Sequence, residues 1–312
     1  MINKIDENNI VHHDEEIDLS ELLFIIWDKK IFIGAMTSLA AIISLIYALN
    51  LPDIYTSKSL LAPSTKEDSL SSKLGSISSI ASFGGISLPS GSGSKSDEAL
   101  ERIKSFEFFS NYFLPYIKLE NIIATKKWIP QANTLLYDEK LFNSTTSKWI
   151  RNVSYPKKVI PSAQEAFEHY KKIVSVSEDN KTSFITISVD HYSPEVAKKW
   201  LDIIIYQINE SMRKVDSDNS QKAISFLNET VQSTTNQSLR EAIVKLLENQ
   251  TQILMLTNSN KYYVLKIIDS PIIPENKSKP SRALICILGI LFGSIFSIVT
   301  VLIYHFGRLS KT

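Results

Sequence analysis

Two long apolar stretches bracket a mixed region in this chain. Residues 31–51 are 21 consecutive residues without a charge, and residues 283–307 are 25 residues without a formal charge. Each stretch exceeds the roughly 20 residues that a helix needs to cross the apolar core of a bilayer. We therefore predict transmembrane helices at residues 31–51 and 283–306, with residues 1–30, 52–282 and 307–312 outside the bilayer core.

The segment before the first apolar stretch has a helical pattern of its own. Residues 16–30 place apolar side chains on one face, and Asp18 is placed to cap the helix. The apolar stretch that follows is too long for a cleaved signal peptide, and no small-residue cleavage site follows it. We expect an amphipathic helix within residues 1–30 that leads into an uncleaved anchor.

The residues between the two stretches alternate between strand and helix patterns. Period-two alternation predicts strands at residues 55–61, 172–177, 183–190 and 262–268. Helix patterns cover residues 96–113, 162–172, 194–233 and 238–257, with capping boxes at Ser162–Glu165 and Ser238–Glu241. Four prolines predict irregular structure over residues 114–161. The expected fold is an α+β domain with long helices, flanked by two transmembrane helices.

A segment rich in serine and glycine follows the first strand. Residues 69–96 contain 12 Ser and 5 Gly among 28 residues. This composition is typical of a loop, and we expect a flexible flap.

The last two predicted helices are joined by a polar break at residues 233–237. The second of them carries an apolar stripe at heptad-like spacing. Its members include Leu239, Ile243, Leu246 and Ile253. The stripe either packs inside one subunit or lies between subunits of an oligomer, and the sequence leaves both open.

The net charge of the chain is small, and the charge of each segment is more informative. The net charge is +1, made up of −5 in residues 1–30, +4 in residues 52–282 and +2 in residues 308–312. No segment is basic enough to predict a nucleic-acid partner. Lysines before the first span favour a cytoplasmic N-terminus, whereas basic residues before the second span argue the other way. Because the first span usually dominates, we expect both termini in the cytoplasm.

Motifs for catalysis or cofactor binding are missing from the sequence. Gly91–Ser96 is nearest to a phosphate-binding loop, but Ser94 stands where glycine is required. The five histidines have no metal-ligand spacing, and the single cysteine, Cys286, lies in the second apolar stretch. We therefore expect a protein that is not an enzyme and that has no cofactor, no metal and no disulfide.

Small residues recur every four positions in both apolar stretches, which lets two helices approach closely. We predict that the two spans pack through Gly34, Ser38, Gly289, Gly293 and Ser297.

Two flanking motifs complete a recognisable layout. The acidic and aliphatic run Glu16–Leu22, followed by Trp27 and Lys30, leads into the first span. Pro271, Pro274 and Pro280 lead into the second span. Together with the Ser/Gly flap, this layout resembles the polysaccharide copolymerase family, or Wzz-type chain-length determinants, over nearly all of residues 15–306.

The resemblance implies a non-enzymatic regulator in a bacterial inner membrane. Its main domain would be periplasmic, it would form a ring-like homo-oligomer, and it would set polysaccharide chain length together with an integral-membrane polymerase that extends a lipid-linked glycan. Lipopolysaccharide O-antigen is the expected polymer. The alternative is a two-span periplasmic sensor, or an activator of a separate kinase in capsule or exopolysaccharide synthesis. Some family members carry a kinase domain after the second span, which we do not expect here.

Overall fold

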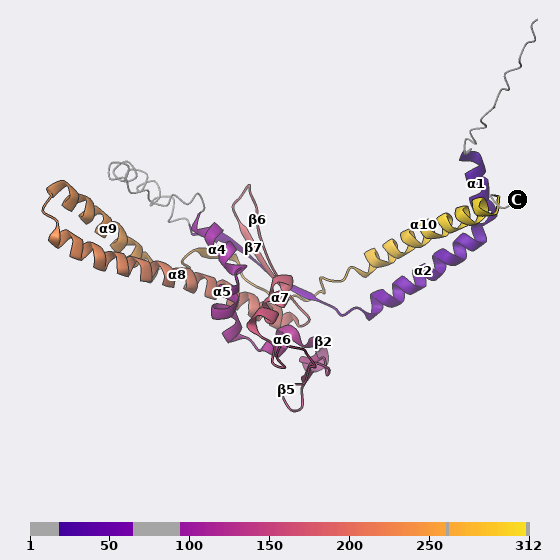
Figure 1. Ribbon diagram of the computed structural model, residues 1–312, viewed down its shortest axis with the longest axis horizontal. Helices are drawn as coiled ribbons and strands as arrows, with labels where there is room; N and C mark the ends of the chain where they lie inside the picture. Colours follow the sequence, from indigo (N-terminus) through magenta and orange to yellow (C-terminus); the bar gives the residue numbers. More distant parts are fainter. Residues whose placement is uncertain (1–18, 65–93, 260–261, 310–312) are drawn as a thin grey trace, which may run out of the picture. The chain divides into compact units, whose positions relative to one another are not determined.

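The computed structural model describes residues 19–64, 94–259 and 262–309. The chain divides into two compact units: a helical unit, Met1–Leu51 with Pro280–Thr312, and a central domain, Pro52–Lys279. Figure 1 shows the elements of both units. The flap expected at residues 69–96 lies almost entirely outside the described residues.

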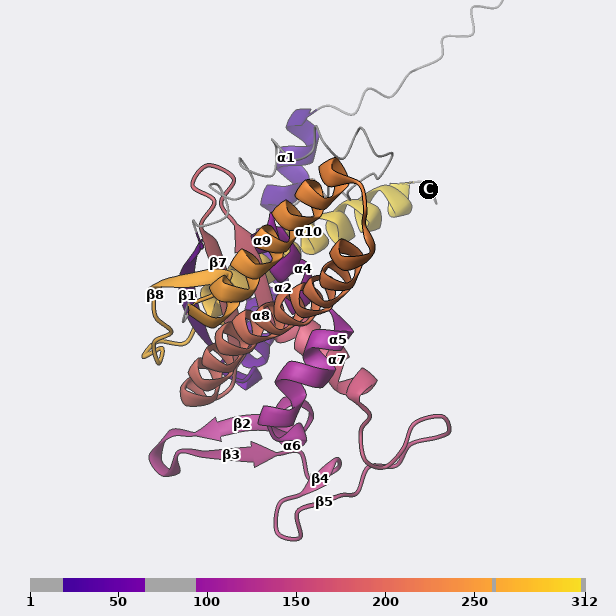
Figure 2. The same ribbon diagram turned by 90° about the vertical axis from the view of Figure 1, so that its left-hand side faces the viewer.

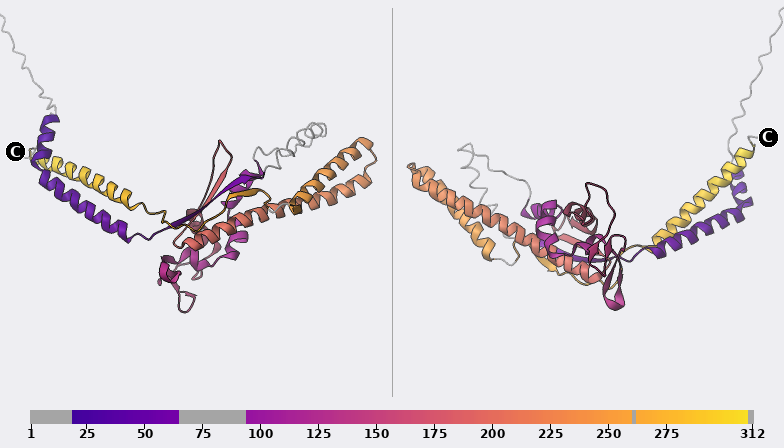
Figure 3. Two further views of the ribbon diagram at one scale, coloured as in Figure 1. Left: turned by 180° about the vertical axis from the view of Figure 1, so that it is seen from behind. Right: turned by 60° about the horizontal axis from the view of Figure 1, so that its bottom comes forward.

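The helical unit contains three helices. They are α1 (Leu19–Asp28), α2 (Lys30–Asn50) and α10 (Arg282–Leu309). Helices α2 and α10 run side by side in Figures 1 and 3, and α1 contacts both. Both α2 and α10 are long and apolar enough to cross a membrane, with mean hydropathies of 2.1 and 2.6. Their side chains are mostly exposed, as expected for helices that lipid would surround.

A four-stranded antiparallel sheet forms the centre of the other unit. Its order is β6 (Val174–Glu178), β7 (Ile185–His191), β1 (Tyr55–Pro63) and β8 (Leu265–Asp269). All four strands were expected from alternation, and the structure confirms them. The first and last strands of the domain are therefore neighbours, since β1 pairs with both β7 and β8. An additional bridge pairs Ile54 with Lys279, at the point where the chain enters and leaves the domain.

One face of this sheet is buried and the other is open. Along β7, Ile185, Ile187 and Val189 are fully buried, while the residues between them are partly exposed. Their partners on β1 are Leu61, Ser59 and Ser57, which are also buried. This period-two pattern is that of a sheet covered by helices on one side only.

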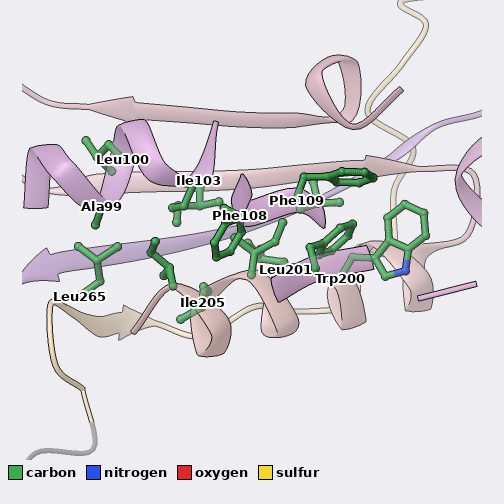
Figure 4. Packing of buried hydrophobic residues seen from close by; sticks show 14 of the residues in the cluster. Ala99, Leu100, Ile103, Phe108, Phe109, Trp200, Leu201, Ile205 and Leu265 are labelled. Atoms are coloured by element: carbon green, nitrogen blue, oxygen red, sulfur yellow. The ribbon is translucent and has the colours of Figure 1, made fainter. Parts of the chain in front are cut away.

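Helices from different parts of the central domain cover the buried face of the sheet. Helices α4 (Lys95–Ile103), α7 (Ala163–Ile173) and α8 (Pro194–Ser233) contribute most of this covering layer. Figure 4 shows Leu201 and Ile205 of α8 facing Ile103 and Phe108 across the core, with Trp200 further along, towards Phe109. Phe109, Phe113, Tyr170 and Trp200 form an aromatic cluster in which the centroids of contacting rings are 5.0–6.0 Å apart. The Tyr170 hydroxyl donates to the carbonyl of Ile103 at 2.9 Å, and burial raises the pKa of this phenol.

The helix expected over residues 96–113 is interrupted. Helix α4 ends at Ile103, and Ser105 caps a new turn, α5 (Phe106–Phe108), by accepting a hydrogen bond from Phe108 N at 3.1 Å. A π-helical turn, Phe109–Phe113, and a 3₁₀ turn, Leu114–Tyr116, follow. The widened turn accompanies burial of Phe108, Phe109 and Phe113 together, which helix periodicity alone does not predict.

Residues 114–161 are more regular than expected. They contain α6 (Leu119–Ile123) and two small antiparallel hairpins. The hairpin strands are β2 (Thr125–Ile129), β3 (Thr134–Tyr137), β4 (Phe142–Asn143) and β5 (Lys148–Trp149). Proline does not prevent the first hairpin from forming. Pro130 opens the 3₁₀ turn between β2 and β3, where no hydrogen bond between the strands is lost. The expectation of irregular structure was therefore wrong for this segment.

A helical hairpin extends from the sheet. Helix α8 has the predicted bounds, and at 40 residues it is about 60 Å long. Ser193 caps it, and Pro194 occupies its first turn. Helix α9 (Gln237–Ser259) returns alongside it, as Figures 2 and 3 show. Ser238 does not cap α9 as predicted, because Asn236 takes that role and accepts from Leu239 N at 3.2 Å.

Candidate functional site

The closest approach in the helical unit is between α10 and α2. A β-carbon added at Gly289 would overlap the Ser44 side chain, and one added at Gly293 would lie 2.5 Å from the Ala40 β-carbon. Ser297, one step further along the same face, is fully buried. Because glycine has no side chain, the two backbones can come together here. The structure therefore places Gly289, Gly293 and Ser297 in the helix contact.

The residues predicted to face them on α2 are not in this contact. A β-carbon at Gly34 would meet nothing within 4 Å, and Ser38 is exposed. The contacting face instead carries Thr37, Ala40, Ser44 and Ala48. Neighbouring residues differ by about 100° around a helix, so a stripe shifted by one position turns away from its partner. Both stripes consist of small residues, and spacing alone could not distinguish them.

Arg282 links the start of α10 to the C-terminal end of α2 by hydrogen bonds. It is the first residue of α10, and its Nε donates to the carbonyl of Ala48 at 3.1 Å. Its Nη2 donates to the carbonyl of Leu51 at 3.3 Å. The last carbonyls of a helix lack intrahelical partners and carry partial negative charge, so a guanidinium stabilises them. In the sequence, Arg282 stood out only as one of the basic residues before the second span.

The proline-rich segment is held along β1. Ser57 Oγ donates to the carbonyl of Ile272 at 2.8 Å, and Ser278 N donates to the carbonyl of Ile54 at 2.8 Å. Lys279 Nζ lies 2.6 Å from Asp190 Oδ2. Pro271 is buried, whereas Pro274 and Pro280 are partly buried. The segment thus runs from β8 back to the start of the domain in an extended conformation, which proline favours.

The apolar stripe of α9 divides between two faces. Ile243 is buried, and Leu246 and Ile253 are partly buried between α9 and its surroundings. Leu239 is 53% exposed and belongs to an outer set of apolar side chains on the hairpin. The other members of this outer set are Phe226, Val244 and Met255. Within one chain, the hairpin therefore buries the first set and leaves the second available to a further subunit.

A polar network ties the base of the hairpin to α4. Lys95 Nζ donates to Asp216 Oδ2 at 2.6 Å, and Tyr263 OH donates to the same oxygen at 2.5 Å. The three residues come from α4, from α8 and from the segment before β8. The lysine that was weighed as part of a phosphate loop is therefore an anchor, and Ser94 beside it caps α4.

Chemistry beyond packing is sparse in the described residues. No group of three His, Cys, Asp or Glu side chains in residues 19–64, 94–259 and 262–309 is placed to hold a metal. A hollow of about 180 Å³ beside α8 has Asp202 and Glu210 in its lining. Both carboxylates are paired with cations of their own helix, Lys198 and Arg213 respectively. Each of these two carboxylates therefore has a cation partner on α8.

The fold defines the class of protein: a mixed α+β domain flanked by two helices that are long and apolar enough to cross a membrane. Residues 15–113 match the family described as chain length determinant protein (Wzz). Residues 228–306 match the family described as G-rich domain on putative tyrosine kinase (GNVR). Two separate regions of the chain, one at each end, therefore resemble these families. The Wzz family is described as one of chain length determinants, which are non-catalytic regulators of polysaccharide chain length.

Solved structures with the same description are distant in sequence. The chain is similar to a full-length bacterial polysaccharide co-polymerase at 15% identity and a TM-score of 0.40, covering 93% of this chain and 98% of the other. It is similar to a fragment of WzzB, a polysaccharide co-polymerase from Salmonella Typhimurium, at 13% identity and a TM-score of 0.32, covering 73% and 100%. No curated protein matches the chain. The resemblance to these families rests on the two sequence matches.

Proposed function

We propose that this chain-length determinant acts on lipopolysaccharide O-antigen. It works with an integral-membrane polymerase on a lipid-linked glycan, at the periplasmic face of the bacterial inner membrane. The observation that carries this proposal is a Wzz region that includes the first span and leads into a domain large enough to contact a growing polymer.

The working form in this proposal is a ring-like homo-oligomer. The exposed apolar side chains of the α8–α9 hairpin support it, because Phe226, Leu239 and Met255 are each more than half exposed in a single chain. Apolar patches of this kind commonly mark protein contacts. Cross-linking of the full chain in membranes, followed by sizing, tests this part.

Topology is the second part of the proposal: both termini are cytoplasmic and residues 52–282 are periplasmic. A phosphatase reporter fused after Thr312 should be inactive, and the same reporter inserted within residues 69–96 should be active. An active C-terminal fusion would contradict the two-span arrangement.

The decisive experiment is a lipopolysaccharide gel from a deletion strain. The ladder should lose its modal cluster of bands and keep its repeat units, since polymerisation continues without length control. A ladder of normal distribution would reject O-antigen as the polymer. Complementation with the full chain should restore the cluster.

A second candidate is activation of a separate kinase in capsule or exopolysaccharide synthesis. The GNVR match favours it, because that family is described by its occurrence on putative tyrosine kinases. In this case the deletion should lower tyrosine phosphorylation and capsule polymer size, and the lipopolysaccharide ladder should stay unchanged.

A further inference from the structure

The positive charge of the central region is concentrated in one segment. Residues 125–161 contain six lysines and Arg151 against Asp138 and Glu139, which gives +5. Residues 52–282 as a whole carry 29 basic and 25 acidic residues, a net charge of +4. The rest of that region is therefore slightly acidic. This basic segment contains both small hairpins and the loop after them, and we call it the basic lobe.

The two hairpins of the basic lobe pack against each other. Tyr137 and Phe142 meet edge to face at 5.3 Å, and Phe142 meets Trp149 at 5.2 Å, so packed aromatic rings join the two hairpins. Figure 2 shows these hairpins next to each other, beyond α6. Edge-to-face aromatic pairs add to the stability that burial already gives. The lobe is thus a preformed surface.

The loop at residues 151–160 is fixed by a buried ion pair. The Arg151 guanidinium, 9% exposed, makes two parallel hydrogen bonds to Glu165, at 2.6 and 2.8 Å. The same guanidinium donates to the carbonyls of Lys158 and Val159, at 2.5 and 2.9 Å. One side chain therefore sets the shape of the loop that carries Lys157 and Lys158.

The loop at residues 151–160 exposes both apolar and basic side chains. Tyr155 is 97% exposed and Ile160 is 63% exposed, with Lys157 and Lys158 exposed between them. Ile150, Val159, Ile129 and Leu136 add further exposed apolar area to the lobe. Aromatic and aliphatic tips beside lysines are the combination that proteins use at membrane–water interfaces.

The lobe lies at the end of the central domain where the chain connects to both spans. Trp128 of β2 packs against Tyr55 of β1, with ring centroids 5.5 Å apart. Only residues 51–54 separate α2 from β1, which allows a reach of about 14 Å. On the other side, Lys279 pairs with Ile54, and α10 begins at Arg282. Short connecting segments therefore join this end of the domain to α2 and α10.

We propose that the basic lobe binds the lipid surface of the membrane in which the two spans are anchored. Tyr155, Ile150 and Ile160 enter the headgroup region, and the lysines lie against anionic headgroups. This inference requires the spans to be in a bilayer, but it does not depend on which polymer the protein handles. A surface for a protein partner is the alternative occupant, and the experiment below distinguishes the two.

The test uses the full chain in liposomes, with Cys286→Ser to remove the native thiol and a nitroxide attached at Tyr155→Cys. Asn228→Cys, an exposed position of α8 on the side opposite to Phe226, is the control. At position 155, collisions with lipid-soluble oxygen should increase relative to collisions with a water-soluble nickel chelate. The control position should show the ratio of bulk water. Liposomes that contain phosphatidylglycerol should increase the difference over phosphatidylcholine alone.

Charge reversal tests the role of the lysines. Lys157→Glu with Lys158→Glu should remove the effect of phosphatidylglycerol, whereas Lys222→Glu, an exposed lysine of α8, should keep it. Circular dichroism confirms that each variant is folded. Equal accessibility at positions 155 and 228 in both lipids would overturn the proposal. If the reversal still altered the ladder in cells under that outcome, the lobe would bind a protein and not lipid.

Discussion

His191 should make the central domain sensitive to mild acid. Its imidazole is 6% exposed, at the end of β7, with its ring 4.7 Å from that of Trp200. Nδ1 accepts a hydrogen bond from Ser193 N at 3.0 Å, and Nε2 lies 3.1 Å from the carbonyl of Asn121. This geometry requires a proton on Nε2 and none on Nδ1. A second proton would face the Ser193 N–H.

Burial lowers the pKa of His191 from 6.5 to about 4. Above pH 6.5 the imidazole is neutral in both the folded and the unfolded chain, and it causes no loss of stability. As the pH falls below 6.5, the unfolded chain gains a proton that the folded chain does not, so folding is progressively penalised. The loss reaches about 2 kcal/mol at pH 5 and approaches a limit of about 3 kcal/mol below pH 4.

The measurement compares the full chain in detergent with a His191→Asn variant. The Asn oxygen can still accept from Ser193 N, but it does not titrate. Urea unfolding is followed by tryptophan fluorescence at several pH values between about 7.5 and 4.5. The free energy of unfolding of the wild type should fall more steeply with acid than that of the variant, by about 2 kcal/mol at pH 5. Parallel curves for the two proteins would refute the reasoning.

Three further predictions concern packing. Gly289→Leu with Gly293→Leu should force α2 and α10 apart and reduce oligomer formation by cross-linking, whereas Gly34→Leu, with open space around it, should behave as wild type. Leu246→Asp should lower the melting temperature by placing a carboxylate between apolar side chains, while Leu239→Asp should keep the fold and reveal any subunit contact as a smaller species on sizing. Arg151→Met should cost about 1–3 kcal/mol in urea unfolding, because the Glu165 carboxylate loses its ion-pair partner, and an additional Glu165→Gln, which can still accept from Ser162 N, should restore part of the loss.

The sequence was most informative where one physical signal had no competitor. A charge-free run long enough to cross a bilayer is typical of a membrane span, and two such helices are present. Alternation located all four strands of the main sheet, because one face is buried and the other is open. The start of α8 combined a capping serine with proline in the first turn, and its bounds followed.

The sequence failed where two similar signals lay side by side. Gly34 and Thr37 begin stripes that are about equally small, and only the position of α10 decides between them. Asn236 and Ser238 are both good capping residues two positions apart, and the first one caps. In residues 114–161 the prolines led to a prediction of irregular structure, although proline is compatible with a turn between two strands. The role of Arg282 had no sequence signal, since its partners are backbone carbonyls 231 and 234 residues away.

The order of the strands determines which variants can separate assembly from folding. Because β1 and β8 are adjacent in the sheet, the domain joins its own two ends through backbone hydrogen bonds. The Ile54–Lys279 bridge and the Lys279–Asp190 ion pair extend this closure up to the residues that precede the spans. In the part of the chain that the structure describes, the main buried hydrophobic cluster is built from the central domain. A change at Gly289 or Gly293 therefore alters the spans without removing any contact that holds the domain closed. If the double leucine variant changes oligomer size but its central domain keeps the stability of the wild type, the change reports on assembly and not on folding.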